Sequence, residues 1–497
     1  MKKKCIALVC AAALALSLTA CGTTGQTGTA GTDTNTNAEQ TSAAVLSLEG
    51  ATTLTFTDSG VTASDGDYTG YEIDGTALTI DGAGTYILTG SCGSGSVTVK
   101  KGTTGVTLVL NGLDLTSADT APIACNKSTE VTICAADGSV NVLTDSAENN
   151  DESYPDNADA ENAVIKCKDG SRVTLCGTGS LTVNAKGKNG IKSGASTAEE
   201  GEASLTIREL ALTIDAPVND AVNAEQLLTI ESGTLNISAG DDALHSDLAL
   251  NIGADGTAGP TITITDCYEG IEGATLNIYS GDITINAADD CLNAANGDLS
   301  GYDFSMNISG GTITAYTSGG DGFDSNGDLN ITGGSVTVWS ASSADNQPLD
   351  ADGTIRITGG TVLAAGGSGG MGMSLTAEQP CVTFSFGGAG GFGGNSGSAL
   401  TKGSAFTIGS GSTAVYSGEA LCNAGFVFFS SPDLTAGSSY DLAAGGSTIA
   451  TAAAQTGSVQ TGMGGMGGQP GQMPGGSFDP GSAPTPPSGD FRPGNRQ

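Results

Sequence analysis

The sequence predicts an all-β protein whose chain winds into stacked coils, and three observations carry this prediction. Glycine is unusually common, at 78 of 497 residues, and shows no collagen-like period. Short runs of alternating apolar and polar residues, typical of strands, recur through the middle of the chain. A triplet of apolar, variable and small residues recurs with them, mostly every 21 to 31 residues. Because glycine disfavours helix by about 1 kcal/mol per residue, a helical bundle is not expected.

The charge balance excludes one large class of function. The chain carries 53 acidic and 17 basic residues, a formal net charge of −36. A general nucleic-acid binder needs clustered Lys and Arg to contact phosphates, so nucleic acid is not an expected partner. Hydrophobic residues make up 38% of the chain, too many for a wholly disordered acidic protein.

The N-terminus has the order of an export signal. Three lysines, Lys2 to Lys4, precede an apolar stretch from Ile6 to Leu18 that is too short to span a bilayer. Leu18-Thr19-Ala20-Cys21 resembles the bacterial lipobox, in which the cysteine becomes the lipidated first residue. We therefore predict a lipoprotein signal peptide over 1–20, with ordinary secretion as the alternative. The protein is then expected on the outer face of the bacterial membrane, held only by lipid on Cys21.

The segments at both ends of the mature chain lack a core-forming pattern. Residues 21–45 are mostly Thr, Gly and Asn, which predicts a flexible linker. Residues 451–497 are rich in Gly, Pro and Met, which predicts a disordered tail.

The repeated triplets predict the architecture between these ends. Each triplet is followed by two alternating runs, and glycine pairs such as Gly333-Gly334 separate the runs. Three short strands per repeat with glycine corners describe one coil of a parallel β-helix. We assign 46–366 to this helix, with the first coils and cap in 46–120, and 367–450 to a closing C-terminal β subdomain. The triplets begin at Ile123, Ile165, Ile191, Val222, Leu244, Ile271, Leu292, Phe323 and Leu349.

Four cysteines match one another across the first two repeats. Cys125 and Cys167 take the small inward position of consecutive triplets, and Cys134 and Cys176 end matching strands. Stacked strands are close enough for disulfides, but parallel stacking directs both Cβ atoms the same way, so buried unpaired thiols acting as small apolar residues are the preferred interpretation. The acidic segment Asp145–Asn162 fills the longer gap between these repeats and is expected to be a surface loop.

The middle triplet positions should stack into an exposed column that runs from basic to acidic. Like charges at the spacing of stacked strands repel, so a cation or retained protons must separate them. Calcium fits best because it takes six to eight oxygen ligands in flexible geometry. A solvated acidic face without metal remains the alternative. The predicted calcium ligands are Asp220, Asp241, Asp242, Glu269, Glu272, Asp289, Asp290, Asp321, Asp324 and Asp350.

A basic patch precedes the acidic column. Lysines beside calcium would suit an acidic polysaccharide, whose carboxylates pair with lysine or bridge through metal. Scattered surface lysines that improve solubility are the simpler alternative. Exposed tyrosines or Trp339 could stack on sugar rings. The predicted carbohydrate-binding residues are Lys166, Lys168, Lys188, Lys192, Asn223, His245, Asn293 and Tyr268.

Several motifs together resemble a known family. Tyr268-Glu269-Gly270-Ile271-Glu272-Gly273-Ala274 and the flanking Asp-Asp runs at 241 and 289 are similar to the bacterial carbohydrate-binding β-helix family related to clostridial cellulose- and pectin-binding surface proteins. Val106 to Gly112 and Ser430 to Leu434 also fit its pattern. The resemblance covers nearly all of 46–450. It implies a right-handed parallel β-helix, bound calcium, and polysaccharide binding without demonstrated catalysis.

Three functions follow as hypotheses. The first is a monomeric, non-catalytic surface lipoprotein that binds pectate, polygalacturonate or cellulose with calcium. The second is a calcium-dependent polysaccharide lyase, in which calcium acidifies the proton next to a uronate carboxylate and Lys192 acts as the base. The third is a structural adhesin whose coils calcium only rigidifies.

Overall fold

The computed structural model describes residues 48–64, 69–341, 346–367, 373–386 and 400–461. Every regular element in these ranges is a strand, which confirms the all-β class. Most strands join one large, mainly parallel sheet, and a small antiparallel sheet lies near the C-terminus. No helix in the described ranges is long and apolar enough to cross a membrane. Cys21, the signal peptide and the linker lie outside the described residues.

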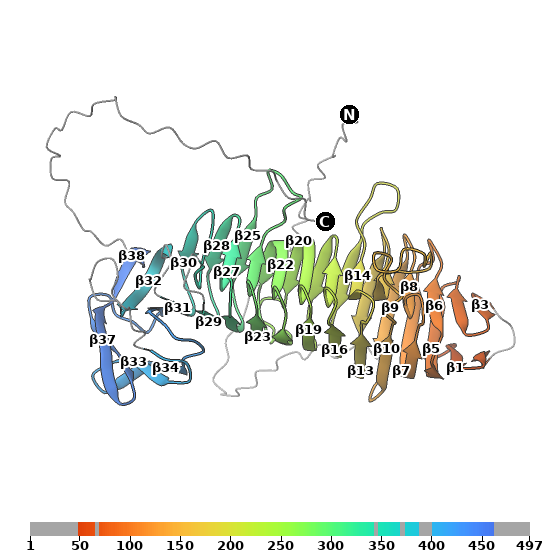
Figure 1. The fold of residues 1–497 in the computed structure, drawn as a ribbon, viewed down its shortest axis with the longest axis horizontal. Coiled ribbons are helices and arrows are strands. Elements are labelled where there is room, and N and C mark those ends of the chain that lie inside the picture. Colours follow the sequence, from red (N-terminus) through yellow and green to blue (C-terminus); the bar gives the residue numbers. More distant parts are fainter. Residues whose placement is uncertain (1–47, 65–68, 342–345, 368–372, 387–399, 462–497) are drawn as a thin grey trace, which may run out of the picture. The chain divides into compact units, whose positions relative to one another are not determined.

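The large sheet consists of three parallel ladders, because the chain passes from one ladder to the next and returns one coil further along (Figure 1). The first ladder, here called the triplet ladder, contains the predicted triplets. Its strands are β4 (Ala77–Ile80), β6 (Ser96–Val99), β8 (Ile123–Cys125), β11 (Ala163–Cys167), β14 (Asn189–Ser193), β17 (Val222–Ala224), β20 (Leu244–Ile252), β22 (Ile271–Ile278), β24 (Leu292–Ala294) and β27 (Phe323–Ser325).

The second and third ladders contain the alternating runs. The second consists of β1 (Thr52–Thr57), β5 (Gly84–Cys92), β7 (Val106–Thr116), β9 (Glu130–Ala135), β12 (Arg172–Cys176), β15 (Ser204–Ile207), β18 (Leu227–Ile230), the bent strands β20 and β22, β25 (Ser305–Ile308), β28 (Asp328–Ile331), β30 (Ile355–Ile357) and β32 (Ser374–Ser385). The third consists of the end of β7, β10 (Val140–Thr144), β13 (Ser180–Asn184), β16 (Leu210–Ala216), β19 (Gly233–Ala239), β21 (Thr261–Asp266), β23 (Asp282–Ala287), β26 (Thr312–Thr317), β29 (Ser335–Ser340) and β31 (Thr361–Gly366).

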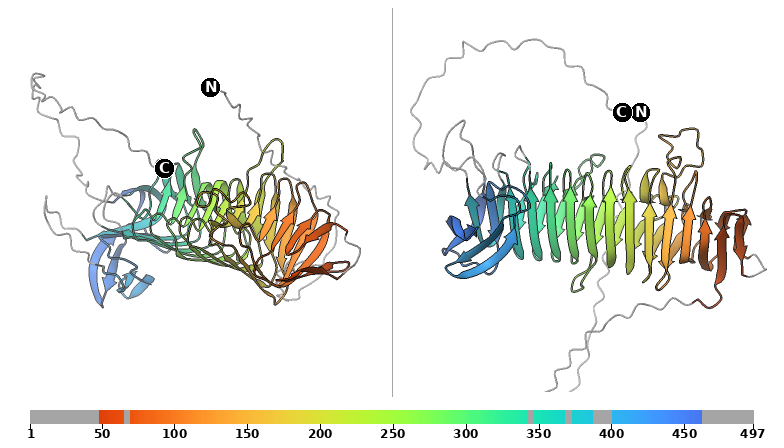
Figure 2. Two further views of the ribbon diagram at one scale, coloured as in Figure 1. Left: turned by 45° about the vertical axis from the view of Figure 1, so that its right-hand side comes forward. Right: turned by 60° about the horizontal axis from the view of Figure 1, so that its bottom comes forward.

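Stacking in register produces the core. Residues at alternate positions of each strand point inward, and Ile191, Val222 and Leu244 form one fully buried apolar column. Each such side chain contributes about 1.5–3 kcal/mol when fully buried. Figure 2 shows the ladder strands side by side from β1 to β31. The period-2 pattern of the sequence therefore fixes which face of each strand is buried.

One corner of the stack explains part of the glycine content. Gly311, Gly334 and Gly360 lie at the same corner of successive coils with φ of +83°, +82° and +80°, a region that L-residues rarely adopt. A Cβ on Gly334 would also lie 2.8 Å from the carbonyl oxygen of Gly310. Both the conformation and the close stacking of coils require glycine there.

Short hairpins and antiparallel strands occupy the two ends. At the N-terminal end, β2 (Gly60–Ala63) and β3 (Tyr71–Asp74) pair antiparallel with β1 and β4. At the other end, β35 (Phe426–Ser430) pairs antiparallel with β31 and β32, and β38 (Gln455–Gln460) with β32. The small sheet contains β34 (Thr413–Glu419), β33 (Ala405–Ser410), β36 (Ser439–Ala444) and β37 (Ser447–Ala453).

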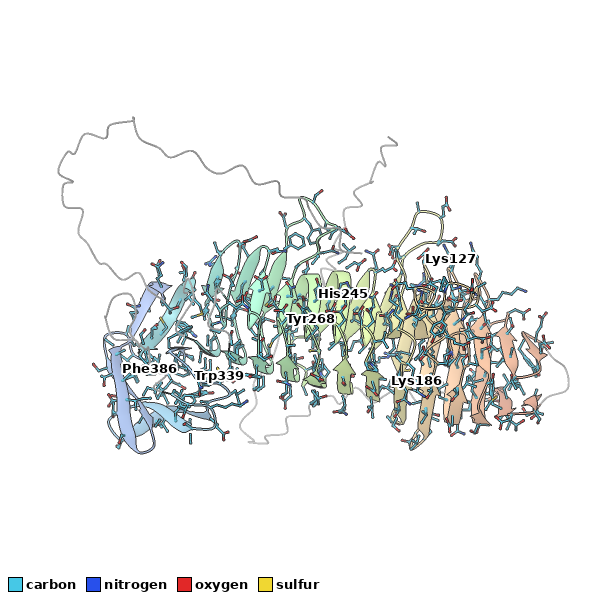
Figure 3. All side chains as sticks on the ribbon, in the orientation of Figure 1. Lys127, Lys186, His245, Tyr268, Trp339 and Phe386 are labelled. Carbon is cyan, nitrogen blue, oxygen red and sulfur yellow. The ribbon has the colours of Figure 1, made fainter. Side chains whose placement is uncertain are left out.

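Two sequence-based expectations are wrong in this region. Residues 451–460, predicted to belong to the disordered tail, form the end of β37 and β38, whereas 462–497 lie outside the described residues. Trp339 (labelled in Figure 3), considered for sugar stacking, is 1% exposed. Its ring packs edge-on against Phe406 of the small sheet, with 5.9 Å between the ring centroids. The indole fills the second apolar core between that sheet and the last coils.

Candidate functional site

The middle residues of the triplets lie in one ladder register and form a continuous row, here called the polar column. The pairing Lys166–Lys192–Asn223–His245–Glu272–Asn293–Asp324 follows directly from the strand register. Asp350 follows, because Leu349 bridges to Phe323. Adjacent parallel strands are about 4.8 Å apart, so neighbouring charges in this column interact strongly.

The polar column is less exposed than predicted. Ala124 and Asn293 are buried, and the other members are half-buried rather than exposed. Loops that follow the triplet strands fold over the column, for example where Asn296 Nδ2 donates to the Asp247 carbonyl oxygen at 2.8 Å. Partial burial strengthens charge interactions here relative to those of a fully solvated face.

His245 lies at the centre of three carboxylates. Its Nδ1 is 2.9 Å from Asp242 Oδ2 and 2.8 Å from Glu272 Oε2, and its Nε2 is 2.9 Å from Asp247 Oδ1. Because both ring nitrogens face carboxylates, both must carry protons, and the ring is an imidazolium. Burial alone lowers the pKa of His245, but the hydrogen bonds to these three carboxylates outweigh it and raise that pKa to about 12.

Two carboxyl groups that precede His245 in the chain, those of Asp220 and Asp242, are strongly desolvated. Burial, with the nearby charges of Asp220 and Glu272, raises the pKa of Asp242 to about 8. Burial also raises the pKa of Asp220, against the hydrogen bond that it accepts from Asn223 Nδ2 at 2.5 Å. These groups form a buried network in which His245 supplies the positive charge.

A pocket adjoins the histidine. It has a volume of about 320 Å³ and is lined by His245, Asp247, Glu272, Asn296, Gly297 and Asp298. The last three residues belong to the loop after β24, which reaches back over two coils to Asp247. No sequence signal predicts a role for this loop, because its contacts have no repeating pattern.

Further along the stack, Asp321, Asp324 and Asp350 come together with no lysine, arginine or histidine paired to them among the described residues. Asp321, Asp324 and Asp350 each offer an oxygen, and these oxygens lie within 4.8 Å of one another. Burial, with the charges of Asp350 and Asp324, raises the pKa of Asp321 to about 7. Burial and the charge of Asp350 also raise the pKa of Asp324. We call this group the acidic cluster.

Asn293 connects the acidic cluster with the coils before it. Its Nδ2 donates to Glu269 Oε2 at 2.9 Å, whereas its buried Oδ1 has no hydrogen-bond partner. Burial raises the pKa of Glu269 to about 7 and that of Asp290 to about 8. An unpaired buried oxygen beside desolvated carboxylates provides the donor set that a hard cation uses, so these residues fit calcium.

Asp241 and Asp289, also predicted as calcium ligands, do not belong to the acidic cluster, and both contact Tyr268. Tyr268 donates a hydrogen bond to Asp289, which raises the pKa of the phenol, and its backbone nitrogen donates to the Asp241 carbonyl oxygen at 3.0 Å. The ring is 49% exposed, and Figure 3 labels it near His245. Tyr268 is thus an exposed aromatic beside the polar column.

The basic end of the column is largely neutralised by acidic partners. Lys168 Nζ is 2.6 Å from Glu161 Oε1, and Lys188 Nζ is 2.6 Å from Glu152 Oε1. Both glutamates come from the predicted surface loop 145–162, and their role was not foreseen. Lys192 is 3.5 Å from Glu225, on the strand-ending segment of the next coil.

Lys166 differs from these lysines. It has no ion-pair partner within the described part of the chain. Burial and the charge of Lys192 lower its pKa. A half-buried amine in this position has unused capacity to bind an anion.

Comparison with known proteins places the chain in a family. Residues 74–372 and 256–441 match the profile of carbohydrate-binding domain-containing proteins. A protein of that description from Acetivibrio thermocellus is 33% identical over 178 residues, which is 35% of this chain and 55% of the relative's length. The chain belongs to the carbohydrate-binding domain-containing family.

One solved structure is similar in part. It is described as a polysaccharide lyase-like protein from C. thermocellum, in a gadolinium derivative. It is 24% identical, covers 63% of this chain and 93% of its own, and aligns with a TM-score of 0.33.

Proposed function

We propose that this protein binds an acidic polysaccharide through the polar column, with calcium held at its acidic end. The observation that carries the proposal is the buried Asn293 Oδ1, which accepts no hydrogen bond from the part of the chain that the structure describes and lies between Glu269 and the acidic cluster. Calcium would satisfy this oxygen together with Asp321, Asp324 and Asp350. It would also relieve the mutual repulsion of these closely spaced carboxylates.

The charges at the two ends favour a polymer of uronic acids such as pectate or polygalacturonate. At the acidic end, calcium has coordination sites left for ligand carboxylates. At the basic end, Lys166 has no ion-pair partner among the described residues and could pair with another carboxylate of the same polymer. Tyr268 would stack on a sugar ring between them. Cellulose, which carries no carboxylates, is the alternative ligand and would use the aromatic contact alone.

We also propose that the fold is a right-handed parallel β-helix and that the protein is anchored at the outer face of the membrane. The succession of three ladders supports a right-handed parallel β-helix, a scaffold that would present the column to an extended polymer. Lipidation at Cys21 would hold this scaffold at the outer face of the membrane.

The test is co-sedimentation of the purified chain with polygalacturonate and with cellulose, in calcium and in chelator. We expect calcium-dependent retention on polygalacturonate, and Asp324→Asn should weaken it at least about tenfold, because one oxygen ligand loses its charge. Asp282→Asn is the matched control, since Asp282 is an exposed aspartate on β23, away from the triplet ladder. Equal retention in chelator would overturn the calcium requirement.

The lyase and adhesin hypotheses are decided in the same experiment. Absorbance of unsaturated product that disappears in Lys192→Ala would establish the lyase. Against the lyase, Lys192 Nζ already lies 3.5 Å from Glu225 Oε1 in an ion pair. Calcium-dependent stabilisation without binding of either polymer would support the adhesin.

A further inference from the structure

Two pairs of cysteines lie in register on adjacent strands near the basic end. Cys125 on β8 lies opposite Cys167 on β11 in the strand register, and Cys134 on β9 lies opposite Cys176 on β12. All nine cysteines of the described residues are free thiols. The two pairs share a ladder geometry, yet their surroundings differ.

Cys125 and Cys167, here called the inner pair, occupy a position that needs a small residue. The same column continues through Ser193 and Ala224 in the next coils, and both are buried. Cys125 and Cys167 are themselves 0% exposed. Their thiols therefore act as small core side chains.

Cys134 and Cys176, here called the outer pair, occupy a position at which later coils have charged residues. Arg208 follows Ile207 just as Cys176 follows Leu175, and Glu231 follows Ile230 in the coil after that. Arg208 and Glu231 are exposed. The fold therefore does not require a small apolar residue here, and packing alone does not account for two cysteines.

The outer thiols are also placed to react with each other. The two thiols of each pair interact with each other, but only those of the outer pair reach the surface, where each residue is 8% exposed. Adjacent parallel strands are about 4.8 Å apart, within the roughly 4.4–6.8 Å between Cα atoms that a disulfide requires. The hydrogen bond from Cys176 lowers the pKa of Cys134 to about 7, which supplies thiolate near neutral pH.

We propose that Cys134 and Cys176 are a redox-active dithiol that a low-molecular-weight disulfide oxidises to a bond between successive coils. The Cys134 thiolate attacks one sulfur of the external disulfide, which forms a mixed disulfide and releases one thiolate. The deprotonated Cys176 then attacks the Cys134 sulfur, which forms the internal bond and releases the second thiolate. The protein pair loses two protons and two electrons, and the external disulfide is reduced to two thiols.

The experiment treats the folded, full chain with oxidised glutathione, blocks the remaining thiols by alkylation under denaturing conditions, and maps the peptides by mass spectrometry. We expect a Cys134–Cys176 linked peptide that lacks two hydrogens, with Cys125 and Cys167 alkylated. The inner pair is the internal control, because it has the same register but no exposure. Full alkylation of Cys134 and Cys176, a glutathione adduct that stays on Cys134, or a bond in the inner pair instead would overturn the proposal.

Thermal unfolding gives a second readout. Oxidation should raise the Tm of the wild-type chain, because a cross-link between coils restricts the unfolded state. The shift should vanish in Cys176→Ser and persist in Cys167→Ser. A shift that survives in Cys176→Ser would contradict the assigned bond.

Discussion

The two ends of the polar column carry opposite charges, and they differ in whether side chains of the opposite charge are paired with them. At the basic end, Lys168 and Lys188 are each paired with a glutamate at 2.6 Å. At the acidic end, the carboxylates of Asp321, Asp324 and Asp350 face one another with no basic partner among the described residues. His245 lies between these regions. The contrast indicates that the basic end, apart from Lys166, is balanced by acidic side chains of the chain itself, whereas the acidic end needs a cation from outside.

Replacing His245 tests the boundary between the two regions and should have the largest effect. In chelator, His245→Ala should lower the free energy of unfolding by about 3–5 kcal/mol, because it leaves buried carboxylates without their internal cation. The side chains of His245, Asp242 and Glu272 are at most 18% exposed, so solvent screens this loss only weakly. Urea denaturation measures the change.

A double variant serves as the control for this loss. His245→Ala combined with Asp242→Asn should recover part of the stability, since the buried charge is removed along with its partner. If His245→Ala is as stable as the wild type, the imidazolium does not balance these carboxylates.

Without calcium, the folded chain should lose stability as pH rises, because the buried carboxyl groups ionise. In chelator, the folded pKa values of about 8 for Asp242 and Asp290 and about 7 for Glu269 and Asp321 lie above those of unfolded carboxyls. The folded state therefore binds more protons than the unfolded state, and stability falls as pH rises from about 4 to about 8.

The histidine changes stability in the same direction over part of this range. Above its ordinary value of 6.5, the folded state keeps the His245 proton that the unfolded state loses. The expected slope is about 1.4 kcal/mol per pH unit for each extra proton. Denaturant titrations at several pH values measure it, and rising stability towards pH 8 in chelator would contradict the burial of these groups.

Added calcium should supply the counter-charge that the acidic end lacks and thereby stabilise the folded chain. At neutral pH, calcium at 100 times its dissociation constant should stabilise the chain by about 2.7 kcal/mol. A rise in Tm on addition of calcium, reversed by chelator, measures this effect. Asp324→Asn should reduce the rise and Asp282→Asn should leave it unchanged. An identical rise in both variants would place the bound ion elsewhere.

The sequence predicted the parts of the site that repeat and missed those that do not. Stacked coils copy one local pattern, so the triplet spacing was enough to align Lys166 with Lys192 and Asn293 with Asp324. Burial of the column depends on loops with no period. Asn296 reaches Asp247 across 49 residues, and Glu152 reaches Lys188 across 36. No local pattern encodes such contacts, so Lys168 and Lys188 were predicted to bind carbohydrate and their glutamate partners were not predicted.

The lysines themselves provide the last test of the comparison, with the smallest expected effect. Lys166→Ala should weaken polygalacturonate binding by about tenfold, because a charge-assisted hydrogen bond contributes about 1.5 kcal/mol or more. Lys188→Ala is the matched control and should have almost no effect, since Glu152 already occupies its ammonium group. Binding isotherms at fixed calcium measure both. If the two variants lose equal affinity, the loop glutamates yield to the polymer and the basic end is not balanced within the chain.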